Sequence, residues 1–342
     1  MTASLALGLA AASSLGLAAC SGGGDADDTT PPASDTASSS ASAGGPEFTI
    51  GVAVYVDHPS LQLIRDGFED YLDEQAVRVT YKDSNAQADS ANVATIATTF
   101  ATDSDLDLIL AITTPIAQGL VQQVTEVPVV YAGVTDPVDA GLVTEIEGPS
   151  GTNVTGASDL NPEAKPVGLI QEIVPDVKTI GVLYSSSEAN SLVQVKSYQD
   201  EAAPLGITIK DTAVTNTNEI ATAVATMTDV DAILIPTDNT VVSGIAQVVA
   251  FGETNKIPVF TADAESLAQG TIASRGLSYY EQGREVGAMA YKILVEGEDP
   301  GAVPAVVSKQ TQLYVNTGAA EKMGVTIPDS LLTDAEIVTT EG

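Results

Sequence analysis

Two series of alternating β-rich and helical segments constrain this 342-residue chain more than any other feature. The first series runs from FTIGVAVYV at 48–56 to VPVVYAGV at 127–134, and the second from TIGVLYS at 179–185 to TIASRGLS at 271–278. Short apolar runs separated by helices are typical of parallel sheets that are covered on both faces. The alternation therefore predicts an α/β fold with two doubly wound parallel-sheet lobes.

The expected elements follow the same order in both series. Strands are expected at 48–56, 77–83, 106–112 and 127–134, and then at 179–185, 207–214, 230–237, 257–262 and 271–278. Helices are expected at 60–75, at 89–102 and from Pro115, and then at 189–203, 218–227 and 241–254.

The two series also share short sequence motifs. TIGV at 49–52 recurs 130 residues later, and VPV at 127–129 returns as IPV at the same offset. LDLIL at 106–110 returns as VDAIL 124 residues later. A matching order with a nearly constant offset favours an internal duplication.

The composition excludes several classes of function. The chain has 13 Lys and Arg residues and 46 Asp and Glu residues, which gives a net charge of -33. Nucleic acid is therefore not expected as a partner. Cys20 and His58 are the sole residues of their types, which excludes an internal disulfide, a Cys/His zinc cluster and a Cys–His catalytic pair. No phosphate-loop, nucleophile-elbow or zinc-protease motif occurs. We therefore expect no catalytic residues, no metal and no cofactor, although a pair of carboxylates for glycoside chemistry stays open among so many acids.

The N-terminus has the features of a processing signal. Residues 5–19 form an apolar stretch that is too short to span a membrane, as in a secretory signal. Its end, Leu17-Ala18-Ala19-Cys20, resembles the bacterial lipobox, so we expect a signal peptide at 1–19 and lipidation of Cys20. The Gly-, Ser- and Asp-rich stretch that follows is expected to be a disordered tether over 20–47. The folded part is then extracytoplasmic and anchored to the cell membrane by lipid.

Polar, hydroxyl-rich loops follow the predicted strands and open helices. Because the carboxyl ends of parallel strands lie at one edge of a sheet, loops of two such lobes can face each other across a central cleft. Ser, Thr, Asp and Asn before a helix are also ordinary N-caps, which is the alternative for each loop taken alone. The loops are 57–60, 113–115, 135–137, 185–190, 237–240 and 262–264.

Together these loops favour a small zwitterion. Helix N-termini favour a carboxylate, and an uncapped Asp238 suits an ammonium group. Lys and Arg are nearly absent from the loops, which disfavours multiply anionic ligands. Trp is absent from the chain, which makes a sugar a less favoured ligand. The loops therefore predict an amino-acid site, with Asp238 on the ammonium and the loop at Thr113 and Thr114 on the carboxylate.

Longer stretches carry a family resemblance. YVDHPSLQLIRDGFEDYL, TTPIAQ, TDPVDAGLV and PTDNTVVS occur in this order. From Phe48 to Val338 the chain resembles the ABC transporter substrate-binding lipoproteins of the ABC_sub_bind family, whose better-known members bind tryptophan or tyrosine.

The resemblance implies a type I periplasmic-binding fold with a hinge of three crossovers. Lobe I is then expected at 48–158 plus 277–302, and lobe II at 159–276 plus 303–342. A monomer is expected to close on a small ligand, with an amino acid favoured, and to deliver it to a membrane permease without turning it over. The implied ligand residues are Asp57, His58, Thr113, Thr114, Pro115, Thr135, Asp136, Glu188, Asn190, Ser191, Thr237, Asp238, Asn239 and Asp263.

The sequence leaves other functions open. The same closing cleft could report a ligand to a membrane receptor, or take a nucleoside or a sugar. An extracytoplasmic enzyme on duplicated lobes is a third reading. Fold and family do not choose among them, because a few wall residues set selectivity.

Overall fold

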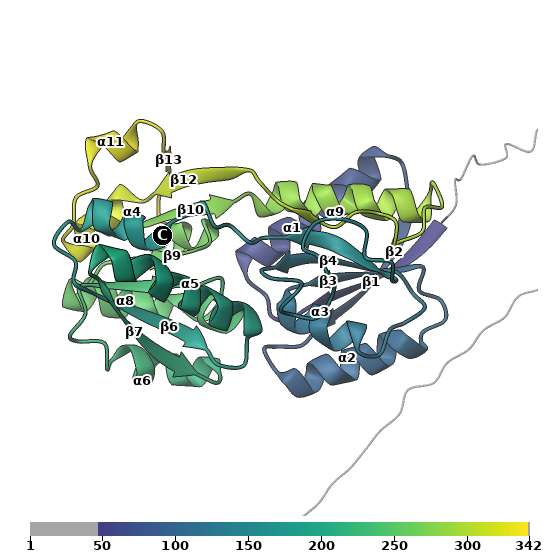
Figure 1. The fold of residues 1–342 in the computed structure, drawn as a ribbon, viewed down its shortest axis with the longest axis horizontal. Coiled ribbons are helices and arrows are strands. Elements are labelled where there is room, and N and C mark those ends of the chain that lie inside the picture. Colours follow the sequence, from purple (N-terminus) through teal and green to yellow (C-terminus); the bar gives the residue numbers. More distant parts are fainter. Residues whose placement is uncertain (1–46, 341–342) are drawn as a thin grey trace, which may run out of the picture. The chain divides into compact units, whose positions relative to one another are not determined.

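The computed structural model describes residues 47–340, which form two sheet-based lobes (Figure 1). The larger sheet is parallel and has the strand order β11-β5-β4-β3-β1-β2. Its strands are β1 (Glu47–Val54), β2 (Arg78–Asn85), β3 (Leu108–Ile112), β4 (Val129–Val134), β5 (Val154–Ser158) and β11 (Val306–Val307). We call this sheet and its helices lobe I.

The second parallel sheet has the order β7-β6-β8-β9. Its strands are β6 (Thr179–Ser185), β7 (Thr208–Val214), β8 (Ala232–Ile235) and β9 (Val259–Thr261). We call this sheet and its helices lobe II. The first four strands of lobe I have the corresponding order β2-β1-β3-β4. The expected α/β class with two parallel sheets is therefore confirmed, and the equal strand order supports the internal duplication.

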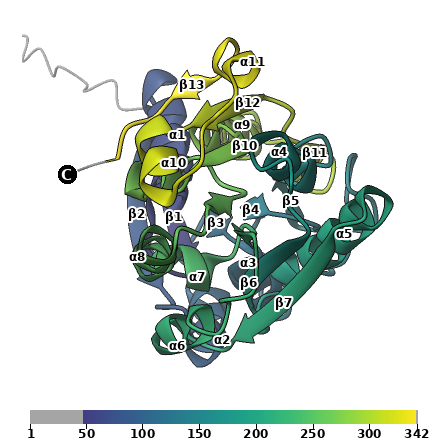
Figure 2. The same ribbon diagram turned by 90° about the vertical axis from the view of Figure 1, so that its left-hand side faces the viewer.

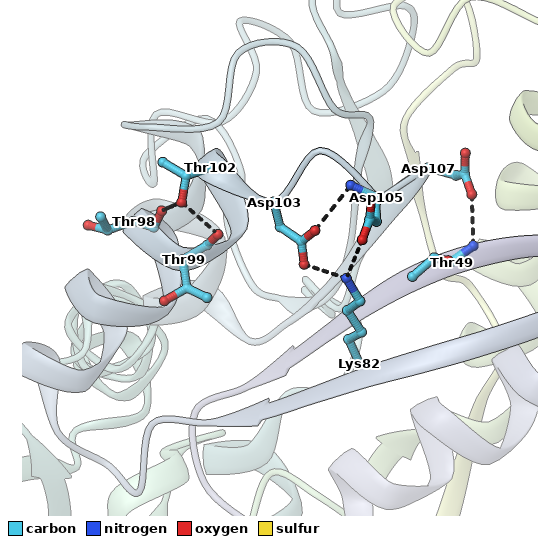
Figure 3. A network of polar contacts seen from close by, with 8 residues as sticks. All are labelled: Thr49, Lys82, Thr98, Thr99, Thr102, Asp103, Asp105 and Asp107. Atoms are coloured by element: carbon cyan, nitrogen blue, oxygen red, sulfur yellow. Dashed lines mark hydrogen bonds and ion pairs between the residues drawn. The ribbon is translucent and has the colours of Figure 1, made fainter.

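One contact occurs in both halves at corresponding places. In lobe I the Asp107 carboxylate accepts a hydrogen bond from Thr49 N at 2.7 Å (Figure 3). In the second sheet Asp231 accepts from Thr179 N at 2.8 Å. Each Asp precedes the third strand of its half and holds the start of the first strand. The two threonines are those of the repeated TIGV motif, so the repeated letters share a structural role.

An ion pair is repeated as well. Lys82 on β2 lies between Asp103 and Asp105, with its Nζ 2.6 Å and 3.7 Å from their carboxylates (Figure 3). Lys210 on β7 pairs with Asp229 in the same way. Both lysines stand opposite the Gly of TIGV in the strand register. Because both pairs lie at the surface and remain accessible to water, each contributes little to stability.

Helices cover both faces of the larger sheet, and β3 shows why. Its five residues, LILAI, are all buried. Leu108, Leu110 and Ile112 pack in a core with α1 and α9, while Ile109 and Ala111 pack in a separate core with α2 and α3. Because successive side chains of a strand point to opposite faces, a continuous apolar run needs cover on both sides.

The helices of lobe I are α1 (Pro59–Glu74), α2 (Ser90–Thr102), α3 (Thr114–Val121) and α9 (Tyr279–Leu294). Those of lobe II are α4 (Pro166–Ile173), α5 (Ala189–Leu205), α6 (Ile220–Val224), α7 (Asn239–Ser243), α8 (Ile245–Asn255), α10 (Thr317–Met323) and α11 (Asp329–Leu332), with 3₁₀ turns η1 (Thr217–Glu219) and η2 (Glu265–Gln269). Figures 1 and 2 both show α8 beside α10. The single helix expected at 241–254 is divided at Gly244 into α7 and α8.

Two sequence expectations are wrong at the C-terminal side. The strand expected at 271–278, observed as β10 (Ala273–Leu277), pairs antiparallel with β12 (Thr311–Val315), which also pairs with β13 (Glu336–Ile337). It touches the parallel sheet at its start, where Ile272 N donates to Val259 O at 2.9 Å, and then leaves for α9. In addition, β11 joins lobe I beside β5, so residues 303–342 do not all lie in lobe II.

Three segments cross between the lobes: the residues after β5, those between β10 and α9, and those between β11 and β12. This is the number of crossovers that the family resemblance implies. The expected signal peptide, Cys20 and nearly all of the expected tether lie outside the described residues.

Helix α9 is held against α1 by very close backbone contact. A Cβ placed on Gly67 of α1 would stand 2.0 Å from the carbonyl oxygen of Tyr280, and one on Gly283 of α9 would stand 2.1 Å from the carbonyl oxygen of Ile64. Figure 1 shows α9 along the α1 side of the sheet. Two glycines thus let the returning helix dock onto lobe I.

Gly67→Ala is expected to destabilise the protein by about 3 kcal/mol, because the added methyl group meets backbone and cannot be accommodated by a rotamer change. Thermal unfolding should show a melting temperature lowered by several degrees. Gly318→Ala is the matched control, since its Cβ would meet its nearest atom at 3.5 Å. Equal melting temperatures for Gly67→Ala and the wild type would contradict the close docking.

Candidate functional site

The loops at the carboxyl ends of the strands meet between the lobes. His58 Nε2 of lobe I lies 3.3 Å from Asn239 Oδ1 of lobe II, and Ser60 Oγ donates to Glu265 Oε2 at 3.1 Å. The hydroxyls of Thr135 and Thr237 lie 3.3 Å apart. These contacts hold the two lobes in a closed arrangement.

Gln194 on α5 connects several of these groups. Its Oε1 accepts from Thr237 N at 3.1 Å and from the Tyr198 hydroxyl at 2.8 Å. Its Nε2 donates to Thr135 Oγ1 of lobe I at 3.3 Å and also to Thr237 Oγ1. A side chain of lobe II therefore reaches into lobe I at the junction.

A small cavity of about 20 Å³ lies at this junction. It has room for one group of about the size of a water molecule. Both lobes line it, with His58, Ser60, Leu61, Gly133, Asp159, Thr237, Asp238, Asn239, Val242, Asp263 and Tyr279.

Two carboxylates on this cavity are each half satisfied. Asp159 accepts from the Tyr279 hydroxyl with Oδ2 at 3.1 Å, while its Oδ1 is buried without a partner. Asp263 accepts from the backbone and the hydroxyl of Ser266 with Oδ2, at 2.9 and 2.6 Å, and its Oδ1 is likewise buried and unpaired. Burial raises the pKa of Asp159 above its usual value. Each carboxylate is thus oriented by one oxygen and keeps the other for a donor that the described residues do not supply.

His58 adds a third acceptor. The Asn239 amide nitrogen donates to Glu188 Oε2, so the amide oxygen faces His58 and accepts from its Nε2. Burial lowers the pKa of His58, which keeps the imidazole neutral. In a neutral ring whose Nε2 carries the proton, Nδ1 is an acceptor. This Nδ1 is buried and unpaired, so the small cavity has three unsatisfied acceptors around it.

A cavity of about 690 Å³ adjoins the small one and shares Asp159, Thr237 and Tyr279 with it. It extends into lobe II between α4, α5 and the strands β8, β9 and β10. Near the junction it is lined by Thr135, Gln194 and Thr237, whose polar groups include an amide donor and two hydroxyls. The apolar side chains on its wall include Leu169, Val193, Tyr198, Leu234, Phe260 and Leu277.

The structure brings some of the predicted ligand residues to these cavities and not others. Those that line a cavity are His58, Thr135, Thr237, Asp238, Asn239 and Asp263. Those that line neither are Asp57, Thr113, Thr114, Pro115, Asp136, Glu188, Asn190 and Ser191. Two of the latter are used by backbone donors of their own lobe: Glu188 accepts from Asn239 N and Thr240 N at the start of α7, and Asp136 accepts from Val138 N and Asp139 N in a turn.

The expectation that Asp238 is uncapped is wrong. It is the N-cap of α7, and its Oδ1 accepts from Val241 N at 2.8 Å. Its Oδ2 accepts from Ser185 N at 2.5 Å and from Ser191 Oγ at 2.7 Å. Burial and the nearby Glu188 raise its pKa to about 8. Because donors of its own lobe satisfy both oxygens, Asp238 has no free acceptor for a ligand ammonium.

Thr113 and Thr114 are almost fully buried at the start of α3, with hydroxyls that have no partner. Thr113 has a φ of 94°, which is rare for a residue with a side chain and indicates local strain. Since neither residue lines a cavity, they do not form the carboxylate site that we expected in this closed arrangement.

Two residues at the junction were missed by the sequence analysis: Asp159 and Gln194. Ser60 lies in the predicted cleft loop 57–60 but was not among the predicted ligand residues. Asp159 directly follows β5, a buried strand that the sequence analysis did not predict because VTGAS is short and contains Gly. Applied to β5, the rule that polar groups gather after parallel strands would have found Asp159. No sequence signal marks Gln194, which lies within a helix.

The closing loops and their cavities agree with comparisons to known proteins. A model of the family described as ABC transporter substrate binding protein matches residues 49–339. The chain belongs to this family. It is therefore a substrate-binding protein of an ABC transporter, and the expected resemblance is confirmed.

A curated relative is the tyrosine-binding protein of Clostridioides difficile strain R20291, which is 34% identical over 274 residues and covers 78% of each chain. A solved structure from Streptococcus pneumonia, an ABC domain in complex with L-Trp, is 38% identical with a TM-score of 0.81 and covers 86% of this chain and all of that one. A ligand-free, open substrate-binding protein from Clostridium difficile is 34% identical with a TM-score of only 0.64, over 86% of this chain and all of that one. The present conformation is thus closer to the liganded relative.

Two further properties concern the described residues alone. Within 47–340 no group of three or more His, Cys, Asp or Glu residues is arranged to hold a metal ion. No helix in that range is long and apolar enough to cross a membrane.

The burial of Glu265, which accepts from Ser60 across the junction, makes the stability of the folded protein sensitive to pH. Burial and the negative charge of Asp263 raise the pKa of Glu265 from 4.5 to about 7. Protonated Glu265 contributes to the free energy of unfolding. This contribution is fully present below pH 4.5 and is lost as the pH rises through about 7. Between pH 5 and 8 the wild type should lose about 2 kcal/mol of unfolding free energy relative to Glu265→Gln.

Denaturant unfolding of both proteins across this range is the measurement. The titration of His58 affects both proteins, so the difference between them isolates Glu265. Parallel pH profiles would contradict the buried environment of Glu265.

Proposed function

We propose that this protein binds an aromatic amino acid between its lobes and delivers it to a membrane permease for import. The observation that supports this ligand is the small cavity with Asp159 Oδ1, Asp263 Oδ1 and His58 Nδ1 around it. An ammonium group has three N–H donors and fits where three acceptors lack a partner. Its positive charge also compensates the two carboxylates, which are costly to bury alone.

The rest of the amino acid fits the near end of the large cavity. Its carboxylate would accept hydrogen bonds from the hydroxyls of Thr135 and Thr237 and from the amide of Gln194, all at the junction. Its ring would lie against Tyr198, Leu234 and Phe260. An uncharged nucleoside or sugar would leave both carboxylates without compensation, so the site favours an amine. The named relatives, a tyrosine-binding protein and an L-Trp complex, support the aromatic side chain.

The same contacts explain the capture of a ligand. Asp159 follows a lobe I strand and Asp263 a lobe II strand, so an ammonium held by both bridges the lobes. A ligand that touches both lobes binds the closed form better and shifts the population toward it. We infer that the lobes move as two bodies about the three crossovers, and that the permease recognises the closed form.

The remaining parts of the proposal concern the setting. We infer an extracytoplasmic protein that is anchored by lipid at Cys20 after removal of residues 1–19. A tether of about 27 residues would place the folded part roughly 30 Å from the membrane. The protein would act as a monomer and release its ligand chemically unchanged.

Asp159→Asn should weaken the binding of tyrosine or tryptophan at least thirtyfold, about 2 kcal/mol, because the variant lacks one negative partner of a desolvated ammonium. Isothermal titration calorimetry of the purified protein measures this loss. Asp57→Asn is the control, because Asp57 is an exposed carboxylate that lines neither cavity. If Asp159→Asn binds within threefold of the wild type, Asp159 does not hold the ammonium.

A further inference from the structure

The large cavity extends well beyond the space that one amino acid needs. At about 30 Å³ per water molecule, 690 Å³ corresponds to about 20 waters, whereas tryptophan has about 15 non-hydrogen atoms, some of them in the small cavity. Past the junction the lining comes from α4, α5 and the strands of lobe II. A free aromatic amino acid would therefore leave the outer part of this cavity empty.

The outer part of the cavity has a different charge from the junction. Lys165 and Arg275 both line it, although the whole chain has only 13 basic residues. Arg275 makes one long ion pair, 3.6 Å to Glu172 on α4. Asp200 and Glu201 also line the cavity, but Glu201 Oε1 already accepts from Gly168 N at 2.8 Å. The cavity thus has unpaired carboxylate oxygens at the junction, and away from the junction it has two cations beside the carboxylates of Asp200 and Glu201.

The distance between the junction and Arg275 fits a short peptide. Asn161 is two residues from Asp159, which is at most about 7 Å along the chain. Its Nδ2 donates to the carbonyl oxygen of Arg275 at 3.2 Å. Once the length of the Asn161 side chain is added, the Arg275 carbonyl oxygen lies no more than about 14 Å from the Asp159 backbone, and an extended dipeptide spans about 7 Å. The guanidinium group can cover the remaining distance.

We propose that this protein also binds apolar dipeptides with a free amino terminus, and binds them more tightly than free aromatic amino acids. The proposal rests on the proposed function for the ammonium end, and it adds a second side-chain site and a carboxylate site at Arg275. The first residue takes the place of the amino acid at the junction. The second side chain fills the apolar cavity between α4 and α5, and the terminal carboxylate lies at Arg275 and Lys165.

Calorimetric titration of the purified protein with tyrosine, with Tyr-Leu and with the C-terminal amide of Tyr-Leu tests this. Tyr-Leu should bind at least tenfold more tightly than tyrosine, and the amide at least fivefold less tightly than the acid. Arg275→Gln should remove the preference for the acid. Glu172→Gln is the control, because it breaks the same ion pair and leaves the guanidinium in place.

A second pair of variants locates the peptide. Ser197 is an exposed residue of α5 that lines the cavity one turn beyond Gln194, whereas its neighbour Gln199 is exposed and does not line it. Ser197→Phe should lower the affinity for Tyr-Leu at least tenfold more than the affinity for tyrosine. Gln199→Phe should change neither affinity.

The outcomes separate the two proposals. If tyrosine binds and Tyr-Leu binds no more tightly, the dipeptide site is overturned and the proposed function stands. If Tyr-Leu binds equally well to Ser197→Phe, the peptide lies elsewhere and the inference also fails. If only Tyr-Leu binds, the inference stands and the aromatic amino acid is not the ligand. If neither ligand binds, both proposals fail.

Discussion

The closed arrangement buries two carboxylates that are only half satisfied, and the cost of this burial is the main constraint on the site. Asp159 and Asp263 are each fixed by one oxygen, through Tyr279 and Ser266, and each keeps an unpaired oxygen beside a cavity of about 20 Å³. Removing a carboxylate from water is costly unless a partner compensates it. A positive ligand group that both carboxylates share reduces this cost, and it does so only when the lobes are closed. In the function that we propose, ligand binding and lobe closure are therefore the same electrostatic event.

The duplicated scaffold explains why such a site can form between two halves of one chain. Both parallel sheets have the same strand order, and in both an Asp before the third strand holds the start of the first. Each half therefore presents the carboxyl ends of its strands in the same way, so polar loops of both halves can face one junction. The halves differ where specificity is required: the large cavity lies almost wholly on the side of lobe II.

Periodicity and composition were sufficient to predict the two sheets, most of their strands and the cleft between them, because a buried parallel strand must be apolar throughout. These patterns gave wrong predictions where one sequence signature is compatible with two different structural roles. Asp238 looks like a free carboxylate before a helix, yet its oxygens are used by its own helix and by Ser185 and Ser191. A capping residue and a ligand residue have the same sequence signature, and only the positions of neighbouring donors distinguish them.

Other misses have equally specific causes. The strand β5 contains Gly156 and has only five residues, so its sequence gave no clear strand pattern. Asp159 directly follows this strand and was therefore not predicted as a site residue. Gln194 lies within α5, and it reaches the junction through the packing of that helix, which no local pattern encodes. The antiparallel pairing of β10 arises from the return of the chain to α9, a property of topology and not of strand composition.

The most direct test of the central claim changes the ligand and leaves the protein intact. Calorimetric titration should compare tyrosine with its des-amino analogue, 3-(4-hydroxyphenyl)propionate, which keeps the ring and the carboxylate and lacks the ammonium. If the ammonium compensates Asp159 and Asp263, the analogue should bind at least a hundredfold more weakly, about 2.7 kcal/mol. An analogue that binds as tightly as tyrosine would show that the junction does not recognise an ammonium group and that lobe closure does not depend on one.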